Sequence, residues 1–257
     1  MINRNYLVTA LLCAGIMGGV PAAAAESASG ALAKAVADPA RPEADRIRDV
    51  DRKPQELIAL TGIHVGARIA EILPGGGYFT RIFSKLVGPE GVVYAWVPFP
   101  AANAPAGGRD LTTPMRALAA DANYPNIKVA NLDPATPLPE AVDLVWTSLN
   151  YHDLAIPGRN TDRAAMNKAI FNALKPGGVY MVIDHAAPAG SGNSLSGTLH
   201  RVEGAWVRAE VEAAGFKFEA ESNMLRNPAD TYTQRLDGDT IATQSDKFVY
   251  RFRKPAR

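Results

Sequence analysis

The sequence predicts an α/β fold: a doubly wound, mostly parallel β-sheet that ends in an antiparallel C-terminal strand. Three observations predict it. A strand, a glycine turn and a helix occupy residues 67–88, strand and helix patterns alternate after them, and the final two strands have no helix between them. Alternating strands and helices form parallel sheets, whereas strands joined without a helix pair antiparallel. In such sheets, ligands bind at the carboxyl ends of the strands.

Residues 1–25 have the composition of a secretory signal peptide. Arg4 precedes an apolar run over residues 7–20, and small residues follow up to Ala25. The run is shorter than the ~20 residues that a membrane-spanning helix needs. We therefore expect cleavage after Ala25, export to the periplasm or the medium, and no stable membrane anchor in the mature protein. The single cysteine, Cys13, would be removed with this segment.

Residues 26–41 are rich in alanine and serine without apolar periodicity, and we interpret them as a mobile linker before one domain over residues 42–257. The chain carries 27 basic and 26 acidic residues. This balance argues against nucleic acid or an anionic membrane as the partner. A small-molecule ligand is the better expectation, and the sequence leaves the oligomeric state open.

The glycine turn is the most informative segment. After Arg68, residues 69–73 are apolar around Glu71, as in a strand buried on both faces, and Pro74 ends the run. The glycines Gly75, Gly76 and Gly77 allow positive φ angles and a close approach of a ligand to the backbone. The helix predicted over Tyr78–Val87 would then present its amino end to that ligand. The alternative is a tight turn that binds nothing.

The other elements follow in order along the chain. Strands are predicted over residues 92–97, 127–130, 142–149, 179–183, 216–220 and 247–253, and helices over residues 43–60, 111–121, 163–174 and 199–214, the first of them interrupted by Pro54. The insertion 98–114, rich in proline and glycine, is too long for an ordinary connection and is predicted to be either functional or disordered.

Four short motifs lie in or next to the predicted strands. They are Glu71-x-x-x-Gly75-x-Gly77 after the first strand, Asp133 after the third, Asp143-Leu144-Val145 in the fourth, and residues 174–178 (LKPGG) before the fifth. With them, residues 55–254 resemble the class I S-adenosylmethionine-dependent methyltransferases. Residues 52–54, 73–78 and 225–228 are similar to those of an exported bacterial branch of predicted methyltransferases.

The resemblance implies a Rossmann-like, seven-stranded sheet and S-adenosylmethionine as the cofactor, with Asp133 contacting the adenine. The residues that it implies for cofactor binding are Glu71, Gly75, Gly76, Gly77, Tyr78, Asp133 and Asn150. It implies methyl transfer to an oxygen or nitrogen of a small-molecule acceptor.

Two positions depart from the family's pattern. Leu73 stands where the family has a further glycine, and its side chain would crowd the methionine part of the cofactor. At the end of the second strand, an acid normally accepts both ribose hydroxyls, but residues 96–99 read WVPF. Losing that acceptor costs on the order of 1–3 kcal/mol, or roughly 5- to 150-fold in affinity. Trp96 and Phe99 there either stack on a ligand ring or close the pocket.

The candidate catalytic residues follow the fourth and fifth strands. His152 and Asp153 follow the fourth, and Asp184 and His185 end the fifth. We expect His152 or His185 to take a proton from the acceptor, with Asp153 or Asp184 fixing the histidine tautomer. The alternative is that these side chains cap helices and fix loops. Tyr151 either lines the acceptor pocket or packs in the core.

His200 and Arg201 are predicted to begin the helix 199–214, where they either bind an anionic acceptor or lie exposed. A metal site formed by His152, His185 and His200 is a further alternative, although their spacing matches no local metal motif, and we predict no bound metal. A last alternative is a binding or scaffold protein that kept the fold and lost methyl transfer.

Overall fold

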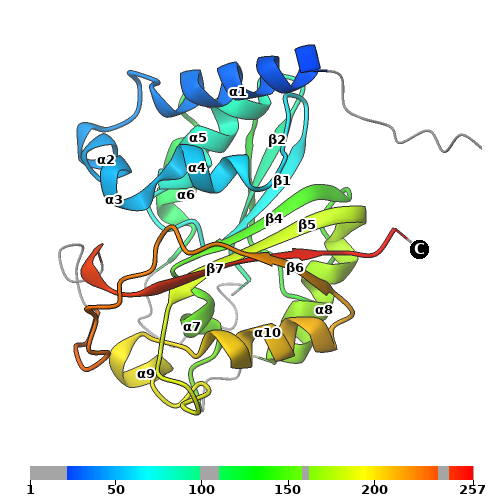
Figure 1. Cartoon of the computed structure of the whole chain (residues 1–257). Coiled ribbons are helices and arrows are strands. Elements are labelled where there is room, and N and C mark those ends of the chain that lie inside the picture. The colour runs from blue at the N-terminus through cyan, green and yellow to red at the C-terminus, as the bar shows by residue number, and fades with distance from the viewer. Residues whose placement is uncertain (1–21, 99–109, 158–161, 237–242, 257) are drawn as a thin grey trace, which may run out of the picture.

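The computed structural model describes residues 22–98, 110–157, 162–236 and 243–256 (Figure 1). Seven strands form one sheet in the order β3-β2-β1-β4-β5-β7-β6. The first five strands are parallel, and β7 runs antiparallel to β5 and to β6. The strands are β1 Arg68–Ile72, β2 Val92–Trp96, β3 Ile127–Ala130, β4 Val142–Ser148, β5 Leu174–His185, β6 Lys217–Glu221 and β7 Lys247–Arg253. The predicted fold class is confirmed.

Helices cover both faces of the sheet (Figure 1). Their bounds are α1 Ala22–Val36, α2 Glu43–Ile47, α3 Asp49–Arg52, α4 Pro54–Ala59, α5 Tyr78–Val87, α6 Thr113–Ala119, α7 Tyr151–Leu154, α8 Arg163–Ala173, α9 Ser196–Leu199 and α10 Gly204–Ala213. None of the helices in the described part of the chain combines the length and the apolarity required to cross a membrane.

The hydrophobic core has two layers because side chains alternate between the faces of each strand. In β4, Leu144 and Trp146 belong to the cluster under α1, α4 and α5, whereas Val145 belongs to the cluster on the opposite face. The predicted strand, turn and helix form as expected. Four of the five residues of β1 are buried, and α5 begins directly after Gly77.

The linker predicted over residues 26–41 is wrong in its first part, because α1 extends to Val36 and packs against α4 and α5. Leu32 and Ala35 are buried in the first core cluster. Alanine has the highest helix propensity, and two apolar residues three positions apart suffice to attach one helix face. Of the predicted signal peptide, residues 1–21 lie outside the described residues.

The helix predicted over residues 199–214 is also wrong in its first turn. The chain instead forms α9 and α10, separated at His200, which adopts a left-handed φ of 55°. Val202 then pairs as a single parallel bridge with Ala186 at the end of β5. The apolar periodicity therefore reflected burial of Val202 against the sheet rather than a continuous helix.

Candidate functional site

The glycine turn lies between β1 and α5, at the carboxyl end of the sheet. Gly75 and Gly77 have positive φ angles of 59° and 85°. A Cβ atom added at Gly75 or Gly76 would meet no atom within 4 Å, whereas one at Gly77 would lie 2.7 Å from the Leu118 side chain. The first two glycines therefore border open space that a ligand can approach, and the third packs under α6.

Glu71 lies beneath this turn. Its carboxyl group is buried and accepts a hydrogen bond of 2.6 Å from the Thr80 hydroxyl in α5. Burial raises the pKa of Glu71 to about 8, although Thr80 and the charges of Arg52 and Arg81 act in the opposite direction. The carboxyl is therefore mostly uncharged at pH 7, and its contact in the structure joins β1 to α5.

Asn150 connects the end of β4 to the glycine turn. Its Nδ2 donates to the carbonyls of Ile72 and Leu73 at 2.8 and 3.0 Å, which fixes the orientation of the amide. Its Oδ1 is buried and accepts no hydrogen bond from the described residues. A buried acceptor without a donor costs free energy, so this atom suits a ligand N–H or O–H group.

Tyr78 is covered by the amino-terminal segment. Its hydroxyl donates to Asp49 at 2.5 Å, and the guanidinium groups of Arg41, Arg48 and Arg52 lie 4.5–5.7 Å from its ring centroid. Burial and the contact with Asp49 raise the pKa of Tyr78. The segment from α1 to α3 thus forms a wall over the start of α5.

The ends of β2 and β3 carry Trp96 and Asp133. Trp96 is buried and its indole N–H donates to the Leu132 carbonyl at 3.1 Å, so it fills the core instead of facing a ligand. Asp133 accepts the backbone N–H of Ala135 at 2.8 Å, within a turn. Leu73 has a positive φ of 49° and packs against the second core cluster. Phe99 is outside the described residues.

His152 and Asp184 form a hydrogen-bonded pair at the ends of β4 and β5. Asp184 is fully buried, and its carboxylate accepts the Nδ1–H of His152 at 2.8 Å and the backbone N–H of His152 at 2.7 Å. Burial alone raises the pKa of Asp184, but the interactions with His152 outweigh burial and hold the pKa below its ordinary value. Because a carboxylate only accepts, neutral His152 carries its proton on Nδ1 and its lone pair on Nε2.

Two further histidines lie beside this pair. The His152 ring centroid is 5.9 Å from that of His185 and 5.4 Å from that of His200. Burial lowers the pKa of His185 to about 3, so this side chain is neutral. Its Nδ1 is 2.6 Å from the Ser245 hydroxyl, and Arg235 donates to His200 Nε2 at 3.0 Å. The three histidines are together, but no group of His, Cys, Asp or Glu among the described residues could hold a metal ion.

For Asp153 and Tyr151 the structure selects between the alternatives that the sequence left open, whereas Arg201 fits neither of its two. Asp153 is 3.9 Å from His152 Nε2, so Asp184 and not Asp153 holds the tautomer. Tyr151 is buried in the second core cluster, where its hydroxyl accepts from Asn167, and it does not line the cavity described below. Arg201 pairs with both carboxylate oxygens of Asp230. Its charge is therefore balanced within the protein and is not left for an anionic acceptor.

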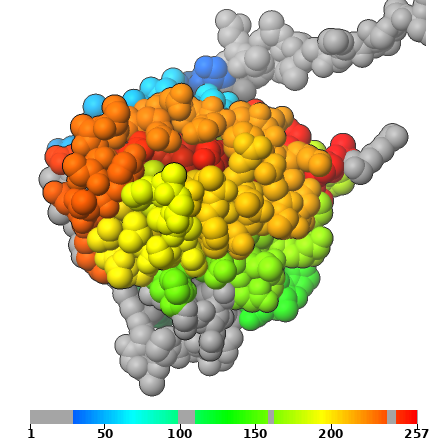
Figure 2. Space-filling model, turned by 60° about the horizontal axis from the view of Figure 1, so that its bottom comes forward, coloured from blue at the N-terminus to red at the C-terminus, as the bar shows by residue number. Residues whose placement is uncertain are grey.

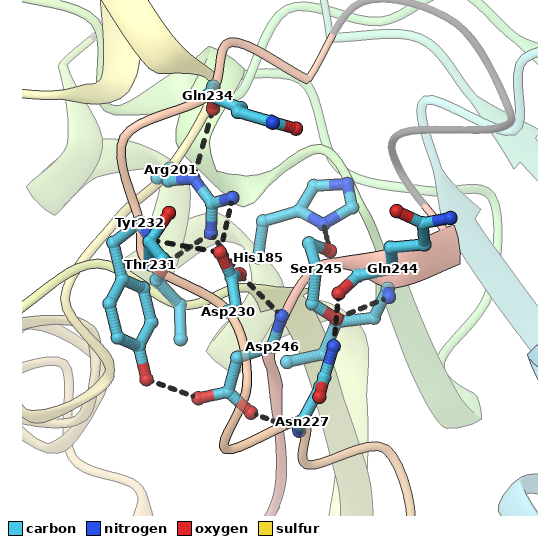
Figure 3. A network of polar contacts seen from close by, with 12 residues as sticks. His185, Arg201, Asn227, Asp230, Thr231, Tyr232, Gln234, Gln244, Ser245 and Asp246 are labelled. Carbon is cyan, nitrogen blue, oxygen red and sulfur yellow. Dashed lines mark hydrogen bonds and ion pairs between the residues drawn. The ribbon is translucent and has the colours of Figure 1, made fainter.

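Arg201 and Asp230 belong to a network that holds the connection between β6 and β7 (Figure 3). Asp246 accepts from the Tyr232 hydroxyl at 2.8 Å, and its own N–H donates to Asp230 at 2.6 Å. Figure 2 shows the connection (orange) beside the segment that contains α9 (yellow). The network places Ser245 against His185.

A cavity opens at the carboxyl ends of β4 and β5, and one residue that lines it, Lys247, pairs with His185 in the β5–β7 ladder. The volume in it that water-sized groups can occupy is about 30 Å³. Apolar walls come from Leu57, Phe79, Leu149, Ile183 and Leu225, and the charged groups that line it are Arg48, Asp51, Arg52 and Lys247.

Sequence reasoning missed Lys247 in this cavity. The signal was present, because an antiparallel last strand begins where β5 ends, and Lys247 pairs with His185. In Figure 1, α2 and α3 lie at this same end of the sheet.

Solved structures with this fold include several methyltransferases. A SAM-dependent methyltransferase from Aquifex aeolicus is 14% identical, with a TM-score of 0.56 over 82% of this chain and 95% of that chain. A putative methyltransferase from Bacillus halodurans is 16% identical, with a TM-score of 0.54 over 79% and 99%. The [4+2]-cyclase SpnF is 15% identical, with a TM-score of 0.58 over 91% and 94%. No protein-family model and no curated protein matches the chain.

At this level of identity the comparisons show the fold alone, and an activity has to be argued from the residues of the site. The seven-stranded sheet, mostly parallel with antiparallel C-terminal strands, is the fold of class I methyltransferases. Its occurrence in a [4+2]-cyclase means that methyl transfer does not follow from the fold alone.

Proposed function

We propose that this protein is an S-adenosylmethionine-dependent methyltransferase that acts on an oxygen or nitrogen of a small-molecule acceptor. The observation that carries the proposal is the His152–Asp184 pair at the ends of β4 and β5, at the same edge of the sheet as a glycine turn with open space at Gly75 and Gly76. In doubly wound sheets this edge holds the ligand. A base and a ligand-binding turn thus belong to one region of a methyltransferase fold.

The residues present fit such a cofactor at two points. Gly75 and Gly76 present backbone with no side chain in the way, and the Asn150 Oδ1 atom is a buried acceptor that a ligand ammonium or hydroxyl would satisfy. We assign cofactor binding to these residues, with Glu71 and Gly77 supporting the turn from below. When bound, S-adenosylmethionine supplies a methyl group on a positively charged sulfur.

The protein's own part in the reaction is to hold the acceptor and to remove its proton. His152 Nε2 carries the lone pair that takes a proton from the acceptor hydroxyl or amine. Asp184 stabilises the imidazolium that results, because its carboxylate already accepts the Nδ1–H at 2.8 Å. The pair is buried, and a hydrogen bond to a carboxylate is stronger in such an environment than in water.

A second candidate function is ligand binding or another reaction on the same fold. Two observations favour it. The end of β2 carries the buried Trp96 instead of a ribose-binding acid, and a [4+2]-cyclase has this fold. Under our proposal the missing acid weakens cofactor affinity by about 5- to 150-fold and does not abolish it.

The test is the release of S-adenosylhomocysteine from S-adenosylmethionine with a panel of small hydroxy and amino compounds. We expect an acceptor-dependent release that falls about 100-fold or more in His152→Ala. Asp153→Ala is the matched control and should keep most of the rate, because Asp153 does not hold the Nδ1–H of His152. Full activity of His152→Ala would remove the base assignment, and no release with any acceptor would favour the second candidate.

We further propose that the chain is exported and belongs with the exported predicted methyltransferases that its segments 52–54, 73–78 and 225–228 resemble. The signal-like composition of residues 1–25 supports the proposal. Amino-terminal sequencing of the mature protein from the periplasm or the medium tests it, with cleavage expected after Ala25. An intact amino terminus in the cytoplasm would contradict it.

A further inference from the structure

The cavity at the ends of β4 and β5 has room for one small ligand group. A cavity needs roughly 10–15 Å³ to hold one water molecule. The cavity volume of about 30 Å³ therefore has room for about two oxygen-sized atoms. A carboxylate carries two oxygens, so the volume fits such a group at the end of a larger molecule.

Lys247, the first residue of β7, is the buried cation of this cavity and is only 8% exposed. Its ammonium donates to the carbonyls of Ser245 at 2.8 Å and Thr243 at 3.3 Å. An ammonium has three N–H groups, and in the described part of the chain the third finds no acceptor. A ligand oxygen would complete the set.

The charge of Lys247 has no ion-pair partner among the described residues. Of the two nearby carboxylates, Asp230 is paired with Arg201, and Asp246 is paired with Arg226. Arg48, Arg52 and Asp51 also line the cavity. Burial and the charge of Arg52 lower the pKa of Lys247 to about 8, although the charges of Asp230 and Asp246 act in the opposite direction. An anionic group in the cavity would compensate the charge of Lys247.

The subsite and the proposed base are neighbours. Lys247 pairs directly with His185 across the β5–β7 ladder, and side chains of such pairs lie on the same face about 5 Å apart. The His185 ring is in turn 5.9 Å from the ring of His152. Phe79, Leu57 and Leu225 provide apolar walls. An anionic group bound at Lys247 would therefore lie close to the proposed base.

We propose that Lys247, together with Arg48 and Arg52, binds the carboxylate of the methyl acceptor, which is therefore a small hydroxy or amino carboxylic acid. The identification of the ligand as an acceptor rests on the proposed methyl transfer. The carboxylate subsite itself does not, because it can be measured without the cofactor.

The test uses benzoate as the carboxylate probe and benzamide as its uncharged analogue, each titrated into the full chain by NMR. We expect benzoate to bind at least about tenfold more tightly than benzamide. Lys247→Met should lose this preference, and Lys247→Arg, which keeps the charge, should retain most of it. Lys217→Met is the matched control, because it removes the same charge from an exposed position on the adjacent strand β6. It should leave both affinities unchanged.

A second measurement needs no variant. Nitrogen-15 NMR of the lysine side chains in the wild-type chain should show the Lys247 signal shifted by benzoate and not by benzamide, with the Lys217 signal unaffected by either. Equal binding of the two probes, or no shift of the Lys247 signal, would overturn the proposal. A shift of the Lys247 signal in a protein that transfers no methyl group would support the subsite and refute methyl transfer. Turnover of S-adenosylmethionine without that shift would support methyl transfer and refute the subsite.

Discussion

Asp184→Asn should destabilise the protein and allow neutral His152 to adopt both tautomers. The two carboxylate oxygens of Asp184 accept three hydrogen bonds, from the Nδ1–H and backbone N–H of His152 and from the backbone N–H of His185, at 2.7–2.8 Å. An amide accepts only through its oxygen, so at least one buried donor would face an NH₂ group. A hydrogen bond to a charged group contributes ~1.5–3 kcal/mol, and the donor left behind adds a desolvation cost. We expect a loss of about 3 kcal/mol in the free energy of unfolding.

Urea denaturation at pH 7, followed by tryptophan fluorescence, measures this loss. Asp153→Asn is the matched control, because it makes the same change one position after His152 at a side chain that is 38% exposed. It should change the free energy of unfolding by less than ~0.5 kcal/mol. Nitrogen-15 NMR should show His152 protonated on Nδ1 when it is neutral in the wild type, and a mixture of tautomers in Asp184→Asn.

The pH dependence of the stability difference between the wild type and Asp184→Asn gives a further check, because the direction of its change is fixed. Interactions with His152 hold the pKa of Asp184 below its ordinary value despite burial. A lowered folded-state pKa contributes stability above the ordinary Asp pKa of about 4 and loses it as the pH falls further. The difference between wild type and Asp184→Asn should therefore shrink below about pH 4. A variant as stable as the wild type at pH 7, or one that keeps the Nδ1 tautomer, would refute the reasoning.

Three other substitutions test the buried charges by urea denaturation. Between pH 7 and pH 5 the free energy of unfolding should fall by about 2 kcal/mol less in His185→Gln than in the wild type. The reason is that His185 binds a proton below about pH 6.5 in the unfolded chain and only near pH 3 in the folded chain. An unchanged pH dependence would contradict this prediction. Glu71→Gln should raise the free energy of unfolding by about 3 kcal/mol at pH 7 and leave it unchanged near pH 4. The reason is that a folded-state pKa raised to about 8 makes the wild type lose stability from about pH 4.5 upward. A loss of stability in the variant at pH 7 would show that the carboxylate is needed in its charged form. Arg201→Met should cost about 3–5 kcal/mol by leaving Asp230 buried and unpaired, and should expose residues 222–236 to protease; a neutral effect with unchanged cleavage would contradict it.

The fold was predictable because its signals are local. Residues 68–87 contain the buried residues of β1, the glycines of the turn and the apolar face of α5, one after another. Each of these patterns indicates one kind of local structure. The antiparallel end of the sheet was predictable in the same way, from β6 and β7 without a helix between them. The amino-terminal helix was not, because alanine-rich composition describes a linker and a helix equally well until Leu32 and Ala35 find a surface to pack on.

The candidate site was predictable only where it follows strand ends. The sequence placed His152 and His185 together, because parallel strands end at one edge of the sheet. Asp184 remained one of two possible partners, since the choice over Asp153 depends on the direction of a side chain in a short helix. Arg201 was misassigned because its partner Asp230 is 29 residues away in the sequence. Ion pairs of this kind depend on tertiary structure and leave no local pattern.

Calorimetric titration of the full chain with S-adenosylmethionine tests the central claim most directly. We expect binding in the micromolar range that Gly75→Val weakens at least about tenfold, because its side chain would enter the open space at the turn. The positive φ of Gly75 strains this variant, so circular dichroism must show that it is folded. Gly62→Val is the matched control, since Gly62 also has a positive φ and open surroundings but lies outside the turn. No binding by a folded, monodisperse wild type, or equal binding by Gly75→Val, would contradict the assignment of the glycine turn as the cofactor site.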